Sequence, residues 1–122
     1  MYNSDFENWS ETSVDIPDVW MSYNSVLINL GLTHTIKSDD AYSGNYALQL
    51  TTFSIQGNYI SSTSNGNFTD DGTTGGMPYA LTQDTLVFYY KYSPVGSDSA
   101  LVMLTFKSNG EAKDWIYKLF PE

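Results

Sequence analysis

The clearest pattern of apolar and polar positions lies in the last third of the chain. Three runs, residues 85–94, 99–107 and 114–120, are dense in the β-branched and aromatic residues that favour strands. Short polar segments at 95–98 and 108–111 separate them, and the second contains Asn-Gly, a strong signal for a tight hairpin turn. The pattern therefore predicts three consecutive antiparallel strands joined as a meander.

Shorter strand candidates precede this region. Residues 46–53 alternate between two faces, and residues 5–9 read as a short opening strand with Phe6 as a core anchor. Residues 20–24 and 33–37 are weaker strand candidates. The apolar segment 25–31 is compatible with either a strand or a single helical turn, and both alternatives stay open.

Residues 61–78 are rich in Gly, Ser, Thr, Asn and Asp, and we expect a long loop there. Several short strands with turn signals and no long helical period predict an all-β fold. We expect an antiparallel β-sandwich of the jelly-roll type. The 122 residues show no repeat or linker, so a single domain over 1–122 is expected.

The charge balance narrows the range of partners. Fourteen acidic residues face five lysines, giving a net charge of −9, and residues 1–36 carry five acids and no base. Such a surface repels phosphate backbones and anionic lipids, which argues against nucleic acid and membrane-surface partners. No apolar run is long enough to cross a membrane. The acidic surface suits either simple solvation or calcium, which prefers oxygen ligands.

Two classes of catalytic chemistry find little support. The chain has no cysteine, and its only histidine, His34, lies in a predicted strand without a nucleophile motif. Glycoside hydrolysis needs two carboxylates across a cleft, and no pair among the fourteen acids is marked by its spacing. We therefore expect a protein that is not an enzyme.

Carboxylates next to turns are the candidate metal ligands. Asp5 and Glu7 flank Phe6, while Asp39 and Asp40 stand side by side in a polar segment. Carbonyl oxygens of the adjoining turns could complete a calcium site with these four residues. In the alternative, Asp39 and Asp40 stabilise a turn through bonds from side chain to backbone.

Aromatic residues near turns are the candidate ligand-binding residues. Sugar rings present C–H faces that pack on aromatic rings while their hydroxyls find polar partners. Trp9 fits the core better than a binding platform because it continues the opening strand. The expected platform residues are Trp20, Tyr23, Tyr59, Tyr79 and Trp115.

Several segments together resemble a known family. Residues 3–9 (NSDFENW) and 37–50 (KSDDAYSGNYALQL) are similar to the opening and the strand entry of jelly-roll carbohydrate-binding modules. Residues 75–79, 84–94 and 98–102 resemble a narrower group, the carbohydrate-metabolism domain of secreted and surface bacterial proteins. The resemblance covers most of the chain, and its last segment is the most specific.

This resemblance implies a jelly roll that binds or handles glycans and is secreted or displayed at the bacterial cell surface, its signal peptide removed. It also implies a structural calcium near Glu7 and residues 39–45. Such domains end in a further acidic strand that has no equivalent here, so we expect either a truncated piece of a longer chain or a shortened relative, with a sandwich that lacks its closing strand. Its open edge would favour a homodimer.

Two functions from different classes follow from the sequence. The first is a non-catalytic carbohydrate-binding module whose partner is a polysaccharide or oligosaccharide. The alternative is a structural or protein-interaction β-sandwich with no sugar affinity.

Overall fold

The chain divides into two compact units, residues Met1–Thr82 (unit 1) and Gln83–Glu122 (unit 2). A computed structural model describes residues 3–11, 14–70, 72–80, 82 and 85–120. Each unit has its own pairs of strands. The expectation of a single sandwich domain over the whole chain stays a prediction.

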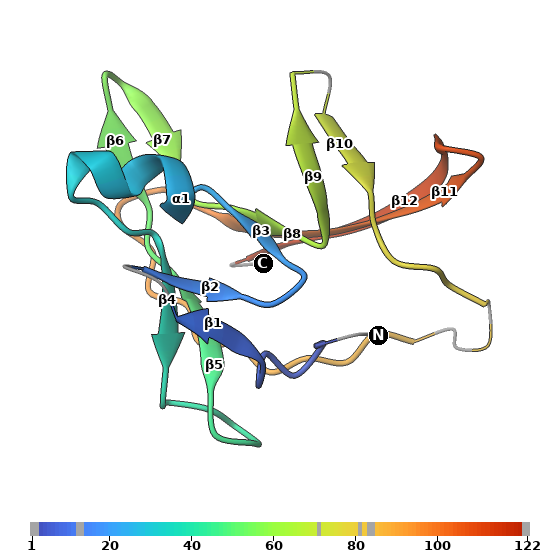
Figure 1. Cartoon of the computed structure of the whole chain (residues 1–122), viewed down its shortest axis with the longest axis horizontal. Coiled ribbons are helices and arrows are strands. Elements are labelled where there is room, and N and C mark those ends of the chain that lie inside the picture. The colour runs from blue at the N-terminus through green and yellow to red at the C-terminus, as the bar shows by residue number, and fades with distance from the viewer. Residues whose placement is uncertain (1–2, 12–13, 71, 81, 83–84, 121–122) are drawn as a thin grey trace. The chain divides into compact units, whose positions relative to one another are not determined.

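Unit 1 consists of short strands and one short helical segment (Figure 1). Its elements in chain order are β1 (Trp9–Glu11), β2 (Asp15–Pro17), β3 (Met21–Ser22), α1 (Asn24–Leu27), η1 (Ile28–Leu30, a 3-10 turn), β4 (Thr35–Ser38), β5 (Ala47–Leu50), β6 (Phe53–Ile55), β7 (Asn58–Ile60), β8 (Thr63–Ser64), β9 (Gly66–Thr69) and β10 (Gly72–Gly75).

The strands pair two by two, and every pair is antiparallel. Within unit 1, β1 pairs with β2, β4 with β5, β6 with β7 and β9 with β10, while β3 pairs with the distant β8. The predicted all-β antiparallel class is confirmed at this level. A jelly-roll sandwich requires larger sheets than these pairs, so that finer arrangement stays a prediction.

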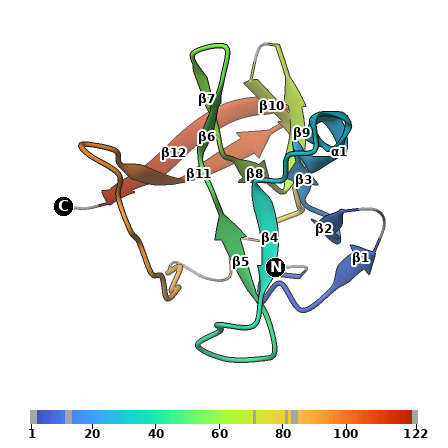
Figure 2. The ribbon, with the colours of Figure 1, turned by 90° about the vertical axis from the view of Figure 1, so that its left-hand side faces the viewer.

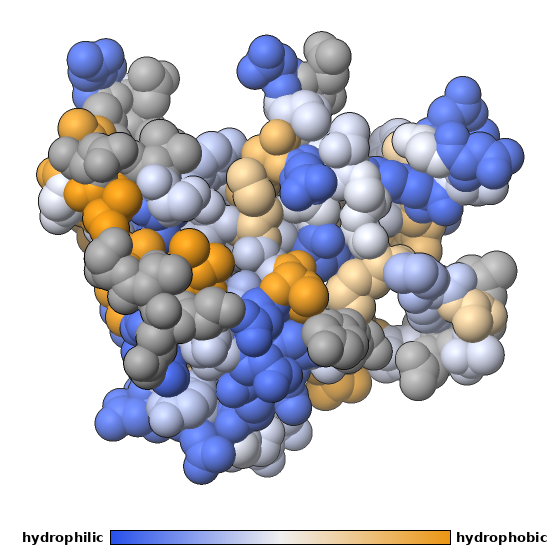
Figure 3. All heavy atoms as spheres, viewed as in Figure 1, coloured by the Kyte–Doolittle hydropathy of each residue, from blue (hydrophilic) through white to orange (hydrophobic). Residues whose placement is uncertain are grey.

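The segment 25–31, for which strand and helix were both open, is helical. Asn24–Leu27 form one α-turn, and Ile28–Leu30 continue it as a 3-10 turn. Gly31 ends the segment in the left-handed conformation (φ 68°), where its N–H bonds to the Ile28 carbonyl oxygen. Hydrophobic residues lie at the surface over this region (Figure 3).

Polar side chains dominate the described interior of unit 1. Ser22, Asn24, His34 and Thr35 are buried, and Leu27 is the buried aliphatic side chain beside them. Asn24 is 0% exposed and links three elements. Its amide nitrogen donates to the carbonyl oxygens of Asp15 and Thr35, and its amide oxygen accepts from the N–H groups of His34 and Thr35.

The expected loop over residues 61–78 is wrong, because β8, β9 and β10 lie there. Thr69 and Gly72 are partners at the end of the β9–β10 hairpin. β-branched threonines on both strands favour extended backbone although the segment is polar overall.

Unit 2 contains the longest strands, β11 (Ala100–Ser108) and β12 (Glu111–Phe120), which form a twisted hairpin (Figure 2). These two strands and their turn confirm the strands predicted at residues 99–107 and 114–120 and the turn predicted at 108–111. The third predicted strand, residues 85–94, is wrong, since this run does not enter a sheet. Two alternate residues of this run, Phe88 and Tyr90, nevertheless lie on the same side, because both of their rings contact Phe120.

Candidate functional site

The β11–β12 hairpin is held in register by its turn. Asn109 and Gly110 have φ angles of 53° and 81°, and Ser108 faces Glu111 across the two-residue loop. Two positive φ angles define the hairpin turn that Asn-Gly favours, whose twist matches that of the strands. Phe106 pairs with Asp114 and Lys107 with Ala112, so Lys113 is the extra residue of a bulge on β12 near this turn.

One face of this hairpin is apolar and exposed. Directly opposed residues project from the same side of a sheet, and the register pairs Thr105 with Trp115, Met103 with Tyr117 and Leu101 with Leu119. We call these six residues the apolar face. Its five large side chains are between 48% and 61% exposed, and none of the six is charged.

The opposite face of the hairpin is buried on β12 at one end only, since Ile116 on that face is 59% exposed. Phe120 is buried there, with its ring centroid 6.0 Å from that of Phe88 and 4.3 Å from that of Tyr90. Because strand side chains alternate, burial of Phe120 turns Trp115, Tyr117 and Leu119 to the other side. The apolar face is therefore a consequence of how the hairpin packs.

The chemistry available on the apolar face is stacking with few hydrogen bonds. Trp115 and Tyr117 are two residues apart on one strand, which places their Cα atoms roughly 7 Å apart. The side-chain polar groups of the face are the indole N–H of Trp115 and the hydroxyls of Tyr117 and Thr105. Such a surface can receive the C–H face of a sugar ring or another apolar protein surface.

Two predicted platform residues of unit 1 pack against other aromatic rings of that unit. The Trp20 ring lies 5.1 Å from that of Phe6, and its indole N–H donates to the Asn3 carbonyl oxygen. Tyr23 stacks on Phe68 with centroids 4.7 Å apart and an interplanar angle of 10°. Both side chains are only half-buried, yet their ring faces already have protein partners.

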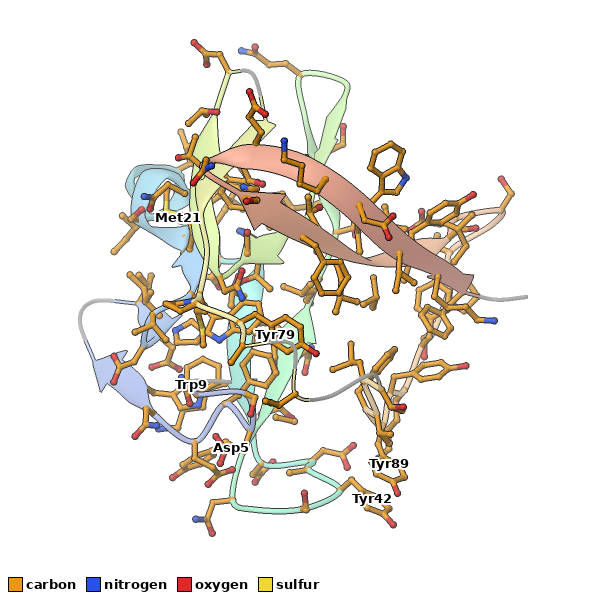
Figure 4. The ribbon with its side chains drawn as sticks, turned by 90° about the vertical axis from the view of Figure 1, so that its right-hand side faces the viewer. Asp5, Trp9, Met21, Tyr42, Tyr79 and Tyr89 are labelled. Atoms are coloured by element: carbon orange, nitrogen blue, oxygen red, sulfur yellow. The ribbon has the colours of Figure 1, made fainter. Side chains whose placement is uncertain are left out.

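The remaining predicted residues do not form a common site. Tyr79 is exposed in the segment after β10 (Figure 4). Tyr59 belongs to β7, and its side chain lies outside the described residues. Trp115 is the predicted aromatic residue that lies on the apolar face. Tyr117 and Met103 were missed, although the alternation of residues 115, 117 and 119 places Tyr117 beside Trp115.

Glu7, a predicted calcium ligand, instead binds backbone N–H groups. Its carboxylate accepts from the N–H of Asn45 at 2.9 and 3.0 Å and from that of Tyr46 at 2.9 Å. The N–H of Tyr46, followed by that of Asn45, lowers the pKa of Glu7 below its ordinary value of 4.5. A turn that directs N–H donors at a carboxylate favours an anion over a cation.

The other predicted ligands do not converge on one point. Asp39 and Asp40 are exposed in the hydrophilic turn between β4 and β5, over which Figure 3 shows polar residues gathered. The Asp39 carbonyl oxygen accepts from Ala41, and the Asp40 N–H donates to Ser38. Asp5 accepts from the Glu7 N–H. Among the described residues no three histidine, cysteine or acidic side chains gather around one point, and calcium binding by these residues stays a prediction.

His34 takes part in the buried polar network. Its Nε2 accepts from the Tyr23 N–H at 3.1 Å, so the proton of the neutral ring sits on Nδ1, 3.3 Å from Thr35 Oγ1. Thr35 Oγ1 also accepts from Ser22 Oγ at 2.9 Å. Burial lowers the pKa of His34 below its ordinary value of 6.5.

Acid should therefore destabilise unit 1 in a histidine-dependent way. Below about pH 6.5 His34 is protonated in the unfolded chain, whereas in the folded protein it stays neutral until the pH falls to its lowered pKa. In this range the free energy of unfolding decreases as the pH is lowered, by up to about 1.4 kcal/mol per pH unit for one proton. Urea denaturation between about pH 7 and about pH 5 should show this slope, and His34→Gln should flatten it. Equal slopes in both proteins would contradict a neutral buried His34.

Comparisons with protein-family models, with curated proteins and with solved structures give no match. No helix within the described part of the chain has the length and apolar character needed to cross a membrane.

Proposed function

We propose that this chain is a non-catalytic carbohydrate-binding module whose ligand stacks on Trp115 and Tyr117. The observation that carries the proposal is the exposure of two neighbouring aromatic rings on one face of β12. The resemblance to secreted and surface bacterial carbohydrate-binding domains supports it independently. A jelly-roll arrangement and export from the cell belong to the same proposal.

The chemistry of the apolar face favours an uncharged glycan. Stacking uses the C–H faces of the sugar, and the two rings offer adjoining places for successive residues of a chain. The net charge of −9 disfavours polysaccharides rich in uronic acid or sulfate, because like charges repel at long range. Neutral polysaccharides are therefore the expected ligands.

A binding screen against soluble neutral and acidic polysaccharides tests this function. We expect binding to a neutral class, and Trp115→Ala or Tyr117→Ala should each weaken it about tenfold or more, the effect of losing about 1.4 kcal/mol. Tyr42→Ala is the matched control, because Tyr42 is an exposed ring on the β4–β5 turn (Figure 4). Binding that survives both face variants in folded protein would contradict the proposed site.

The same screen, repeated with calcium and with EDTA, addresses the metal. A structural calcium near Asp5, Glu7, Asp39 and Asp40 stays a prediction from the resemblance. Sensitivity of folding or binding to EDTA would support it, although the described side chains do not converge there.

The second candidate is a structural or protein-interaction domain with no sugar affinity. Leu101, Met103 and Leu119 favour it, because aliphatic side chains offer no hydrogen bonds to sugar hydroxyls but pack well against another protein. A folded sample that binds no polysaccharide of the panel would favour this function.

A further inference from the structure

The apolar face is large for a surface left in water. Five large side chains that are about half exposed present on the order of 500 Å² of apolar area, near the upper end of the largest patches on monomers. A two-stranded hairpin is also marginally stable unless a face packs against another layer. Phe88, Tyr90 and Phe120 supply such packing on one side of the hairpin only.

We propose that the apolar face docks a second copy of this chain, so that two hairpins pack face to face. This inference concerns the face used in the proposed function but does not depend on glycan binding. Sheets that pack in this way lie about 10 Å apart and interdigitate their side chains. A standard interface buries about 800 Å² per partner, which the patch and a polar rim around it can supply.

The distribution of charge favours a second copy as the occupant. Residues 83–122 hold four of the five lysines and five acidic residues, a net charge of −1, whereas residues 1–82 hold one lysine and nine acidic residues, a net charge of −8. The six residues of each apolar face bring no charge into the contact, and the hairpins add little repulsion.

The sizes of the opposed residues make the face complementary to itself. Each aromatic ring of β12 stands beside a narrower side chain of β11: Trp115 beside Thr105, and Tyr117 beside Met103. A twofold axis parallel to the strands would place β11 of one copy over β12 of the other. Thr105 would then lie opposite the Trp115 ring of the partner, and Met103 opposite its Tyr117 ring, a favourable sulfur–aromatic contact.

Sedimentation equilibrium of the full chain from about 1 μM to about 1 mM tests the inference, because weak interfaces dissociate in this range. We expect a reversible dimer. Met103→Lys should weaken it about tenfold or more, since it places two like charges in a desolvated centre. Leu101→Lys is a second variant, and Val95→Lys, which adds the same charge at the exposed 95–98 turn, is the control.

The outcomes separate this inference from the proposed function. A monomer at every concentration, or a dimer that neither face variant weakens, overturns the inference even if glycans bind. A dimer that Met103→Lys weakens supports it even if the polysaccharide screen is silent, in which case the proposed function fails alone. If both hold, a bound polysaccharide should shift the dimer towards monomer, because the two ligands share Trp115 and Tyr117.

Discussion

Replacing Asn24 by alanine should lower the free energy of unfolding by on the order of 4 kcal/mol, because four backbone groups lose a hydrogen bond, three of them buried and one part-buried. The groups are the carbonyl oxygens of Asp15 and Thr35 and the N–H groups of His34 and Thr35. Asn24 is 0% exposed, so bulk solvent does not contact this side chain in the native protein. Since small domains are stable by about 5–15 kcal/mol, this variant should be close to unfolding.

Denaturation by urea, followed by tryptophan fluorescence, measures this loss. Asn24→Asp tests the hydrogen bonds more specifically, because aspartate has the same size and shape as asparagine. It replaces the donating amide nitrogen by an oxygen acceptor that faces the carbonyl oxygens of Asp15 and Thr35. It should be destabilised about as strongly as Asn24→Ala. Asn67→Ala, at an exposed position of β9, is the matched control and should change little. A small effect for both Asn24 variants would contradict the polar network as the centre of unit 1.

Gly44→Ala should lower the free energy of unfolding strongly for a change that adds only one methyl group. Gly44 has a φ of 75°, which costs a residue with a Cβ atom about 1–2 kcal/mol. The added Cβ would also stand 2.4 Å from Glu7 Oε1, far inside contact distance. The Glu7 carboxylate would have to leave the N–H groups of Asn45 and Tyr46, so the β4–β5 turn would lose its link to the N-terminal segment.

A double-mutant cycle separates the two causes. Gly57→Ala is the control, because Gly57 has a similar φ of 82° and no neighbour within 4 Å of the added Cβ. Gly44→Ala should cost more than Gly57→Ala, and the excess should vanish when Glu7 is already alanine. Equal costs at Gly44 and Gly57 in the native background would show that the carboxylate does not hold this turn.

The hairpin and its exposed ring were predictable from the sequence because both depend on local rules. Asn109 and Gly110 determine a two-residue turn, and the turn sets the register of both strands. Alternation then assigns Trp115 to one face and Phe120 to the other. Which face is exposed depends on Phe88 and Tyr90, which contact Phe120 from a distant part of the chain, and no local pattern records that contact.

Other features could not be predicted because their partners are distant in sequence. Trp20 and Tyr23 stand among polar residues, which suggested exposure, but Phe6 and Phe68 cover their rings. The run 85–94 has the composition of a strand, but a strand also requires a neighbour with which to form a ladder. The polar interior around Asn24 resembles an ordinary turn in the sequence.

The residues that carry the family resemblance in the N-terminal half have structural roles here. Asn3 bonds to the backbone of Asn8 and Asp18, while Phe6 packs on Trp20. The Trp9 indole N–H donates to the Phe6 carbonyl oxygen, and Glu7 holds the turn after Gly44. These structural roles do not by themselves identify a ligand-binding surface, which we place on the apolar face.

The indole N–H signals of the three tryptophans test the proposed binding surface most directly. The indoles of Trp9 and Trp20 donate to backbone carbonyl oxygens, whereas Trp115 lies on the exposed apolar face. In a ¹⁵N-labelled sample titrated with a polysaccharide that binds, we predict that the Trp115 signal shifts while those of Trp9 and Trp20 stay in place. A shift of Trp20 with an unmoved Trp115 would contradict the assignment and place the ligand on unit 1.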